Sequence, residues 1–188
     1  MDHFVNNLGG ESWFTYPSLY SSMVQRFPSG SLFVEVGTWK GRSACYMAVE
    51  IINSNKNIRF DCVDNWEYRE SQTDIPLSSF DNLYEIFLKN IEPVKHIINP
   101  VRELSWDAAR LYEDKSLDFI FIDAAHDYES VKKDLEAWLP KIKDSGVIAG
   151  HDIHHHPIKQ AVNEIFHNRH VHEQEDCWVV DMSENKKQ

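Results

Sequence analysis

Short apolar runs alternate with amphipathic stretches along most of the 188-residue chain. An apolar run of about 4–8 residues between polar or turn-forming residues is typical of a buried strand. The run that ends at Asp123 is the strongest, because its nearly continuous apolar residues indicate burial on both faces of a sheet. The runs that predict strands are Leu32–Val36, Arg59–Asp64, His96–Pro100, Leu117–Asp123 and Val147–Gly150.

The segments between these runs carry apolar residues at helical spacing, which places them on one face of each segment. The segments that predict helices are Pro17–Phe27, Gly41–Ile52, Ser79–Asn90, Ser105–Tyr112, Tyr128–Ile142 and Pro157–His167. The sequence Asp144-Ser145-Gly146 predicts a turn between a helix and the next strand.

Strands that alternate with helices need crossover connections, which produce a parallel sheet with helices on both faces. The tail Val171–Met182 instead suggests two closely spaced strands around a tight turn at Glu175 and Asp176, which predicts an antiparallel hairpin at one edge. We therefore predict a single α/β domain over residues 1–188. It would consist of an N-terminal helical cap over residues 1–30 and a Rossmann-like core over residues 31–183.

The composition narrows the class of protein only slightly. A formal net charge of −11 repels phosphate backbones, so we expect no nucleic-acid partner, and no stretch has the roughly 20 apolar residues of a membrane helix. The N-terminal residues lack the pattern of a signal peptide. Cys45, Cys62 and Cys177 have no CxxC spacing, which favours buried thiols in a reduced compartment, and we expect a cytoplasmic location.

A glycine turn follows the first predicted strand, in the sequence Glu35-Val-Gly37-Thr38-Trp-Lys-Gly41-Arg-Ser43. Its spacing is neither the G-x-G-x-x-G that holds a pyrophosphate nor the GK[ST] that holds a triphosphate. The turn therefore favours a nucleoside without phosphates. Asp64 ends the second predicted strand, where a carboxylate can accept hydrogen bonds from both ribose hydroxyls.

Acidic and imidazole side chains follow the next two core strands. Asp123 and Asp152 come at the carboxyl ends of their strands, so we expect them to face one crevice. Carboxylates can hold a divalent cation, and histidine ordinarily titrates near neutrality, so His126 is a candidate general base. The sequence leaves open that Asp123 caps a helix, that His126 is an ordinary loop residue and that Asp152 pairs with a cation. A zinc site at His154–His156 is disfavoured, because three consecutive side chains point in different directions.

These motifs in this order resemble the class I S-adenosylmethionine-dependent methyltransferases. The sequences E-V-G-T-W-K-G-R-S, F-I-D-A-A-H-D-Y and G-V-I-A-G-H-D-I carry the resemblance, which covers about Phe33–Ile153. It is strongest to the small O-methyltransferase-like branch that includes macrolide-sugar and other natural-product enzymes. The resemblance implies a mostly parallel seven-stranded sheet with a C-terminal antiparallel hairpin and helices on both faces.

The resemblance also implies roles for individual residues. The S-adenosylmethionine would lie along the first turn, over the end of the second strand and beside Asp123. Glu35, Gly37 and Thr38 would lie at its methionine part, and Gly41 and Ser43 at the helix opening near its carboxylate. Asp64 would hold the ribose and Ser105 would lie by the adenine, although Ser105 can equally cap a helix.

Asp123-Ala-Ala-His126 is similar to the D-x-x-H of the sugar-methylating relatives, in which the Asp binds a metal and the His acts as the base. This implies catalytic roles for Asp123 and His126 and a metal site of Asp123, His151 and Asp152, with Mg²⁺ or Mn²⁺ as the expected ion. Several relatives carry two consecutive hard ligands where this chain has His151-Asp152, and an imidazole shifts preference from Mg²⁺ toward Mn²⁺, Fe²⁺ or Zn²⁺.

We therefore expect an O-methyltransferase that acts on a hydroxyl of a small molecule or sugar, with metal assistance. The loop Asn65–Ser78 would form a substrate lid. The short chain lacks the large extra domain that some relatives carry, so we expect a second subunit, as in a homodimer, to supply part of the pocket. A nucleoside-binding module without catalysis is one alternative. A metal-dependent hydrolase is another, but it would need neither the glycine turn nor Asp64. A nicotinamide dehydrogenase is disfavoured by the missing pyrophosphate motif.

Overall fold

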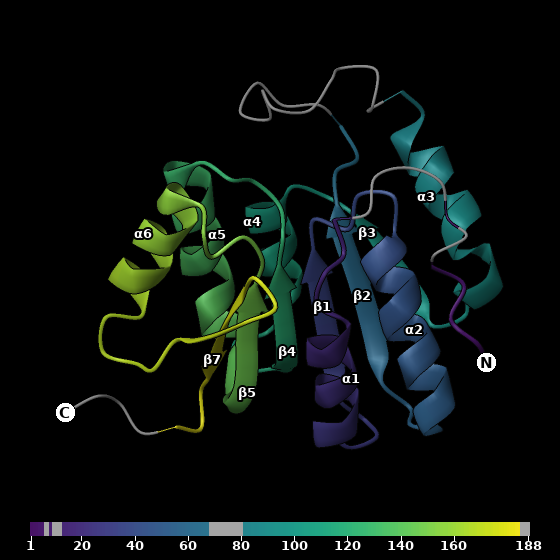
Figure 1. Cartoon of the computed structure of the whole chain (residues 1–188), viewed down its shortest axis with the longest axis horizontal. Helices are drawn as coiled ribbons and strands as arrows, with labels where there is room; N and C mark the ends of the chain where they lie inside the picture. Colours follow the sequence, from purple (N-terminus) through teal and green to yellow (C-terminus); the bar gives the residue numbers. More distant parts are fainter. Residues whose placement is uncertain (6–7, 9–12, 68–80, 185–188) are drawn as a thin grey trace.

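The computed structural model describes residues 1–188 apart from 6–7, 9–12, 68–80 and 185–188. Within the described residues, seven strands form one sheet in the order β3-β2-β1-β4-β5-β7-β6 (Figure 1). The first five strands in this order are parallel, and β7 is antiparallel to both of its neighbours. The strands are β1 Leu32–Val36, β2 Arg59–Asp64, β3 Ile98–Arg102, β4 Leu117–Ile122, β5 Ile142–Gly150, β6 His172–Gln174 and β7 Cys177–Asp181.

Helices cover both faces of this sheet, with α1, α2 and α3 on one side and α4, α5 and α6 on the other (Figure 1). They are α1 Pro17–Arg26, α2 Arg42–Ser54, α3 Leu83–Ile91, α4 Ser105–Ala108, α5 Tyr128–Trp138 and α6 His156–Ile165. This arrangement confirms the predicted α/β fold, the mostly parallel seven-stranded sheet and the antiparallel C-terminal hairpin. None of the described helices is long and apolar enough to cross a membrane.

Side-chain alternation along the central strands divides the core into two layers. On β4, Phe119 and Phe121 pack with α1 and α2, whereas Ile120 and Ile122 pack with α5 and α6. Successive side chains of a strand point to opposite faces, so a strand that is buried on both faces must be apolar throughout. Cys45, Cys62 and Cys177 are free and buried in the first layer, as predicted.

The predicted turn at residues 144–146 is wrong, because these residues lie inside β5. The pairing of β4 with β5 shifts register between Leu117 and Phe119, and this irregularity accommodates the polar residues within the strand. The carboxylate of Asp118 accepts hydrogen bonds from Lys143 Nζ at 2.8 Å and from the backbone N–H of Leu32 at 2.9 Å. The polar residues of this irregular part of β5 therefore have the sequence pattern of a turn although they belong to a strand.

The other boundaries move by a few residues. The third strand begins at Ile98 rather than His96, and the helix predicted from Ser105 continues after Ala108 as a 3-10 turn. The predicted helix over 79–90 starts at Leu83, with 79–80 outside the described residues. Most of the predicted lid over 65–78 also lies outside the described residues.

The turn after β1 lies against the end of β4. Gly37 has a φ of +86°, and a Cβ at this position would lie 2.0 Å from the carbonyl oxygen of Asp123. Two backbone hydrogen bonds of 2.8 Å keep the end of β1 against its neighbouring strands. Gly37 N–H donates to Val63 O, and Asp123 N–H donates to Val36 O. Only glycine fits both the left-handed backbone and this contact, so Gly37 brings the turn and Asp123 together.

We expect Gly37→Ala to lower the free energy of unfolding by about 3 kcal/mol or more, because it adds a backbone clash to a left-handed conformation. Gly30→Ala is the matched control, since Gly30 has a φ of +91° but no atom within 4 Å of the position that a Cβ would take. That variant should lose only roughly 1–2 kcal/mol, the cost of the backbone conformation alone. Urea unfolding of the two variants measures the difference, and equal losses would contradict the contact at Gly37.

Candidate active site

A cavity of about 580 Å³ opens at the carboxyl ends of β1, β2, β4 and β5. This is the edge at which ligands bind in open parallel sheets. Seven of the predicted site residues line the cavity, namely Gly37, Asp64, Ser105, Asp123, His126, His151 and Asp152. The structure therefore brings together residues that are spread over more than half of the chain.

Carboxylates dominate the charge of the cavity wall. Six acidic residues and neither Lys nor Arg occur among the described residues that line it; the acids are Asp64, Glu103, Asp123, Asp134, Asp152 and Asp176. Such a wall attracts a cation and repels phosphate groups. The cavity therefore suits a cationic ligand such as a sulfonium or a metal ion, and it disfavours a nucleotide.

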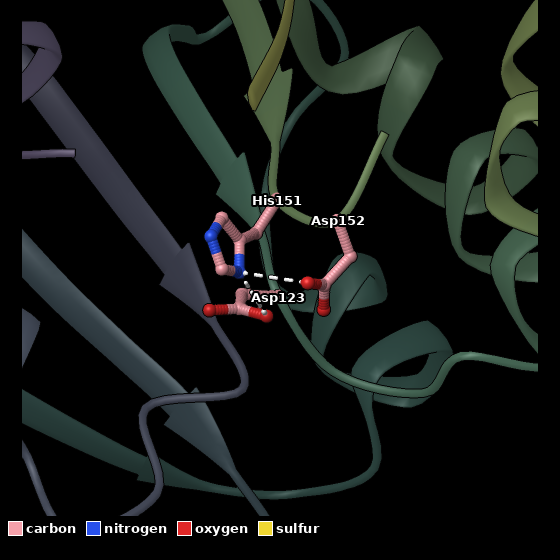
Figure 2. A group of neighbouring side chains, drawn as sticks. All are labelled: Asp123, His151 and Asp152. Carbon is pink, nitrogen blue, oxygen red and sulfur yellow. Dashed lines mark ion pairs between the residues drawn. The ribbon is translucent and has the colours of Figure 1, made fainter. Parts of the chain in front are cut away.

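Asp123, His151 and Asp152 form one cluster within this cavity (Figure 2). Nδ1 of His151 lies 3.3 Å from Oδ1 of Asp152 and 3.8 Å from Oδ1 of Asp123. One donor atom from each residue lies within 4.8 Å of the others. Bonds from a divalent cation to such donors are roughly 2.0–2.2 Å long, so one cation can bridge atoms at these separations.

His126 joins the cluster through the other oxygen of Asp152. Its Nε2 lies 3.1 Å from Asp152 Oδ2, and Asp152 has a left-handed φ of 58°. Burial alone raises the pKa of Asp152, but hydrogen bonds from His126 and His151 and the charges on both rings outweigh burial and hold this pKa well below its ordinary value. Asp152 is therefore an ionised carboxylate between two imidazoles.

Glu35 lies apart from the cavity. It is buried on β1, and its carboxylate accepts hydrogen bonds from Tyr20 at 2.8 Å and from Ser43 at 2.7 Å. Burial raises its pKa to about 8, although both hydrogen bonds act in the opposite direction. Glu35 therefore joins α1, β1 and α2 below the turn, and Ser43 donates its hydroxyl to this contact.

Thr38 and Ser43 of the glycine turn help to line a smaller cavity of about 60 Å³. Thr38 Oγ1 is buried and has no hydrogen-bond partner among the described residues, so it can bond to a ligand in this space. Gly41 precedes α2 with a φ of 82°, and a Cβ there would lie 2.9 Å from the ring of Phe87. Gly41 therefore allows the helix to pack and lines neither cavity.

Asp64, at the end of β2, and Ser105, at the start of α4, also line the large cavity. The carboxylate of Asp64 accepts backbone hydrogen bonds from Trp39 at 2.9 Å and from Trp66 at 2.7 Å, and burial raises its pKa. Ser105 is the first residue of α4, and its Oγ accepts a hydrogen bond from Trp138 Nε1 at 2.9 Å. Trp39 lines the cavity, whereas Trp66 belongs to the core.

Several residues of the site carry no local signal in the sequence. Thr15 and Tyr16 precede α1 but contact His151 and Asp123, which are more than 100 positions away. Trp13, His155 and Asp176 also line the cavity. Only Asp176 had a sequence signal, because it lies in the predicted tight turn of the C-terminal hairpin, beside the end of β5.

A family model described as a methyltransferase domain matches residues 34–153 of this chain. The chain belongs to this family of methyltransferase domains. The match begins within β1 and ends just after Asp152, so it contains the glycine turn and both strand-end motifs. It confirms the resemblance that these motifs carry.

The chain is similar in sequence to one curated protein and in fold to solved methyltransferase structures. The uncharacterized protein y4gI of Sinorhizobium fredii is 26% identical over 121 residues, which are 63% of this chain and 13% of that protein. The chain thus spans only 13% of that relative's length. The solved structure of the O-methyltransferase NovP has a TM-score of 0.71 at 16% identity, covering 89% of this chain and 79% of NovP.

The fibrillarin of Aeropyrum pernix, solved with natively bound S-adenosyl-L-methionine, has a TM-score of 0.55 at 12% identity. The alignment covers 87% of this chain and 73% of the fibrillarin chain. At these identities, the likeness to both solved structures concerns the fold.

We expect Glu35→Gln to remove a pH dependence from the stability of the methyltransferase domain. The folded protein keeps the Glu35 proton up to about pH 8, whereas the ordinary pKa of this group is 4.5. The unfolded state therefore binds fewer protons between these values, and stability falls as the pH rises through this window and is constant above it.

Relative to Glu35→Gln, the wild type should lose on the order of 1.4 kcal/mol of unfolding free energy for each pH unit inside the window. Urea unfolding at several pH values between about 5 and about 8 measures this difference. The upper limit of this range is the raised pKa of Glu35 in the folded protein. Parallel pH curves for the two proteins would show that Glu35 is ionised in the folded state.

Proposed function

We propose that this chain is an S-adenosylmethionine-dependent O-methyltransferase that acts on a hydroxyl of a small molecule or sugar. We further propose that it uses a divalent cation, Mg²⁺ or a softer ion such as Mn²⁺, and that His126 is its general base. The single observation that carries the proposal is the contact of His126 with Asp152 in the same cavity as Gly37 and Asp64.

The residues of the glycine turn fit the proposed cofactor. The buried hydroxyl of Thr38 and the side-chain-free backbone of Gly37 adjoin the space in which a methionine group would lie. Asp64, at the end of β2, would accept the ribose hydroxyls. The acidic wall favours a sulfonium, which carries an electrophilic methyl group when the cofactor is bound. Ser105 remains our candidate for the adenine side, whereas Glu35 would support the turn from below.

The proposed metal would be held by Oδ1 of Asp123, Nδ1 of His151 and Oδ1 of Asp152. Two carboxylates and one imidazole suit Mn²⁺, Fe²⁺ or Zn²⁺ better than they suit Mg²⁺, because nitrogen is a softer ligand than oxygen. A divalent cation bound here would lower the pKa of a coordinated hydroxyl.

His126 is oriented as a base by Asp152. A neutral His126 that donates its Nε2–H to Asp152 Oδ2 carries its lone pair on Nδ1. Nδ1 would take the proton of the acceptor hydroxyl, and the ionised Asp152 would stabilise the imidazolium that forms. An aliphatic hydroxyl is a very weak acid, so this proton transfer is needed before or during the displacement.

The mouth of the cavity suggests the class of acceptor. Trp13 is 49% exposed and lies 6.1 Å from Trp39, ring centroid to ring centroid. Indole faces pack against sugar rings and aromatic rings, and the acidic wall disfavours acceptors that carry phosphate or carboxylate groups. We therefore favour a neutral or cationic acceptor with a ring.

We expect S-adenosylhomocysteine to bind to the purified protein in isothermal titration calorimetry, and we expect NAD not to bind. The acidic wall repels the pyrophosphate of NAD, whereas S-adenosylhomocysteine carries no phosphate. NAD binding in the absence of any S-adenosylhomocysteine signal would overturn the proposed cofactor.

We expect His126→Ala to lower turnover by about 10²–10⁴-fold if His126 is the base, with the affinity for S-adenosylhomocysteine nearly unchanged. Release of S-adenosylhomocysteine from S-adenosylmethionine, with a panel of catechols, sugars and amino sugars as acceptors, measures turnover. His155→Ala is the matched control, because the ring of His155 lies 5.8 Å from that of His126 but the ion pair to Asp152 is made by His126.

The control should lose less than about tenfold of its turnover, since its imidazole has no place in the proposed proton transfer. Equal losses in both variants would reassign the base. A protein that binds S-adenosylhomocysteine but releases none with any acceptor would instead be a nucleoside-binding module without catalysis.

A further inference from the structure

Each member of the Asp123, His151 and Asp152 cluster has one polar atom held by a neighbour and another turned toward the centre of the cluster. In Asp152, Oδ2 contacts His126 at 3.1 Å and Oδ1 contacts His151 Nδ1 at 3.3 Å. This division is typical of metal sites, in which an outer group fixes the orientation of each ligand. The outer groups of the other two members come from the segment that precedes α1.

Tyr16 holds Asp123. Its hydroxyl donates a hydrogen bond of 3.0 Å to Asp123 Oδ2, which leaves Oδ1 on the side of His151. Tyr16 is only 2% exposed, and its ring packs 4.5 Å from Phe121 and 4.9 Å from His151, centroid to centroid. The hydroxyl therefore comes from a rigid ring, and its position fixes the rotation of the carboxylate.

Thr15 holds His151. Its Oγ1 lies 3.0 Å from His151 Nε2 and can donate its one proton to the carbonyl oxygen of Glu175 at 3.4 Å. A hydroxyl that donates to a carbonyl keeps lone pairs that can accept the Nε2–H of the imidazole. Without a cation, Nδ1 of His151 carries the proton that it donates to Asp152. A bound cation would take the place of that proton, and a neutral His151 would then present the lone pair of Nδ1, the nitrogen that faces Asp123 and Asp152.

The same segment is anchored to the C-terminal hairpin. The backbone N–H of Leu19, in the first turn of α1, donates to Glu175 Oε2 at 3.1 Å. Glu175 thus accepts hydrogen bonds from the backbone N–H of Leu19 and from the hydroxyl of Thr15. Both anchored residues lie outside residues 34–153, the part of the chain that matches the methyltransferase family.

We propose that Thr15 and Tyr16 are positioning residues for a divalent cation: Tyr16 fixes the carboxylate of Asp123, and Thr15 fixes the ring and the tautomer of His151. This inference rests on the metal in the proposed function. It assigns part of the site to a segment outside the family core, so a change at residues 15 and 16 alters the metal site without altering any ligand.

The test is the affinity of the purified protein for Mn²⁺ alone, measured by electron paramagnetic resonance of the free ion. We expect Tyr16→Phe and Thr15→Val to weaken Mn²⁺ binding by about 10–100-fold, as the loss of an outer group does in other metal sites. Thr15→Ser, which keeps the hydroxyl, should restore the affinity. Asp152→Ala, which removes a ligand, should abolish binding.

Tyr20→Phe is the matched control. It removes the same hydroxyl from a second buried tyrosine, four residues further along, whose partner is Glu35 rather than a candidate ligand. Thermal unfolding of both tyrosine variants shows whether they lose similar stability, and Tyr20→Phe should bind Mn²⁺ within about twofold of the wild type, because Glu35 lies outside the cluster.

Wild-type affinity in Tyr16→Phe and Thr15→Val would overturn the inference, and so would an equal loss in Tyr20→Phe or a wild type that binds no Mn²⁺. Calorimetry with S-adenosylhomocysteine on the same samples separates these failures from a failure of the proposed cofactor. Selective loss of Mn²⁺ binding would support the positioning role even if no acceptor is methylated.

Discussion

The close contact between the turn at Gly37 and the backbone of Asp123 is the constraint on which the site depends. With no side chain at Gly37, the end of β1 can lie against the end of β4, so the glycine turn and the acidic cluster face one space. A Cβ at Gly37 would lie 2.0 Å from the carbonyl oxygen of Asp123, so the two strand ends would have to move apart. One backbone position therefore connects the proposed cofactor pocket to the proposed chemistry.

Bringing several carboxylates to one edge of a sheet carries an electrostatic cost. A buried carboxylate without partners is destabilising by several kcal/mol, so each one must be protonated, paired or hydrogen-bonded. The fold uses all three solutions. Burial keeps Glu35 protonated near neutral pH, two imidazoles hold Asp152 ionised, and backbone N–H groups bind Asp64. Each of these three carboxylates therefore has its own solution, and Asp64 and Asp152 are the two of them that line the cavity.

Some residues of the site belong to the part of the chain that matches the methyltransferase family, and others lie before or after it. The strand ends of the family core supply the glycine turn and the candidate ligands, whereas the segment before α1 and the hairpin beside β5 supply the groups that orient them. Rigid strand ends position residues more accurately than loops do. Added segments can change from one protein to another without disturbing the core, so the same core can serve different acceptors.

The sequence by itself determined the order of strands and helices, the glycine turn and the strand-end acids, because each of these is a local pattern and parallel strands bring their carboxyl ends to one edge. Alternation along β1 also contained an unused signal: Glu35 shares its face with Phe33, and a carboxylate on that face must be buried. Only the tertiary structure decided that Tyr20 and Ser43 would hold it, that Asp152 would join two imidazoles, and that Thr15 and Tyr16 would contact ligands more than 100 positions away. Such contacts depend on how α1 packs across the sheet, and packing is a property of the whole fold that no local pattern encodes.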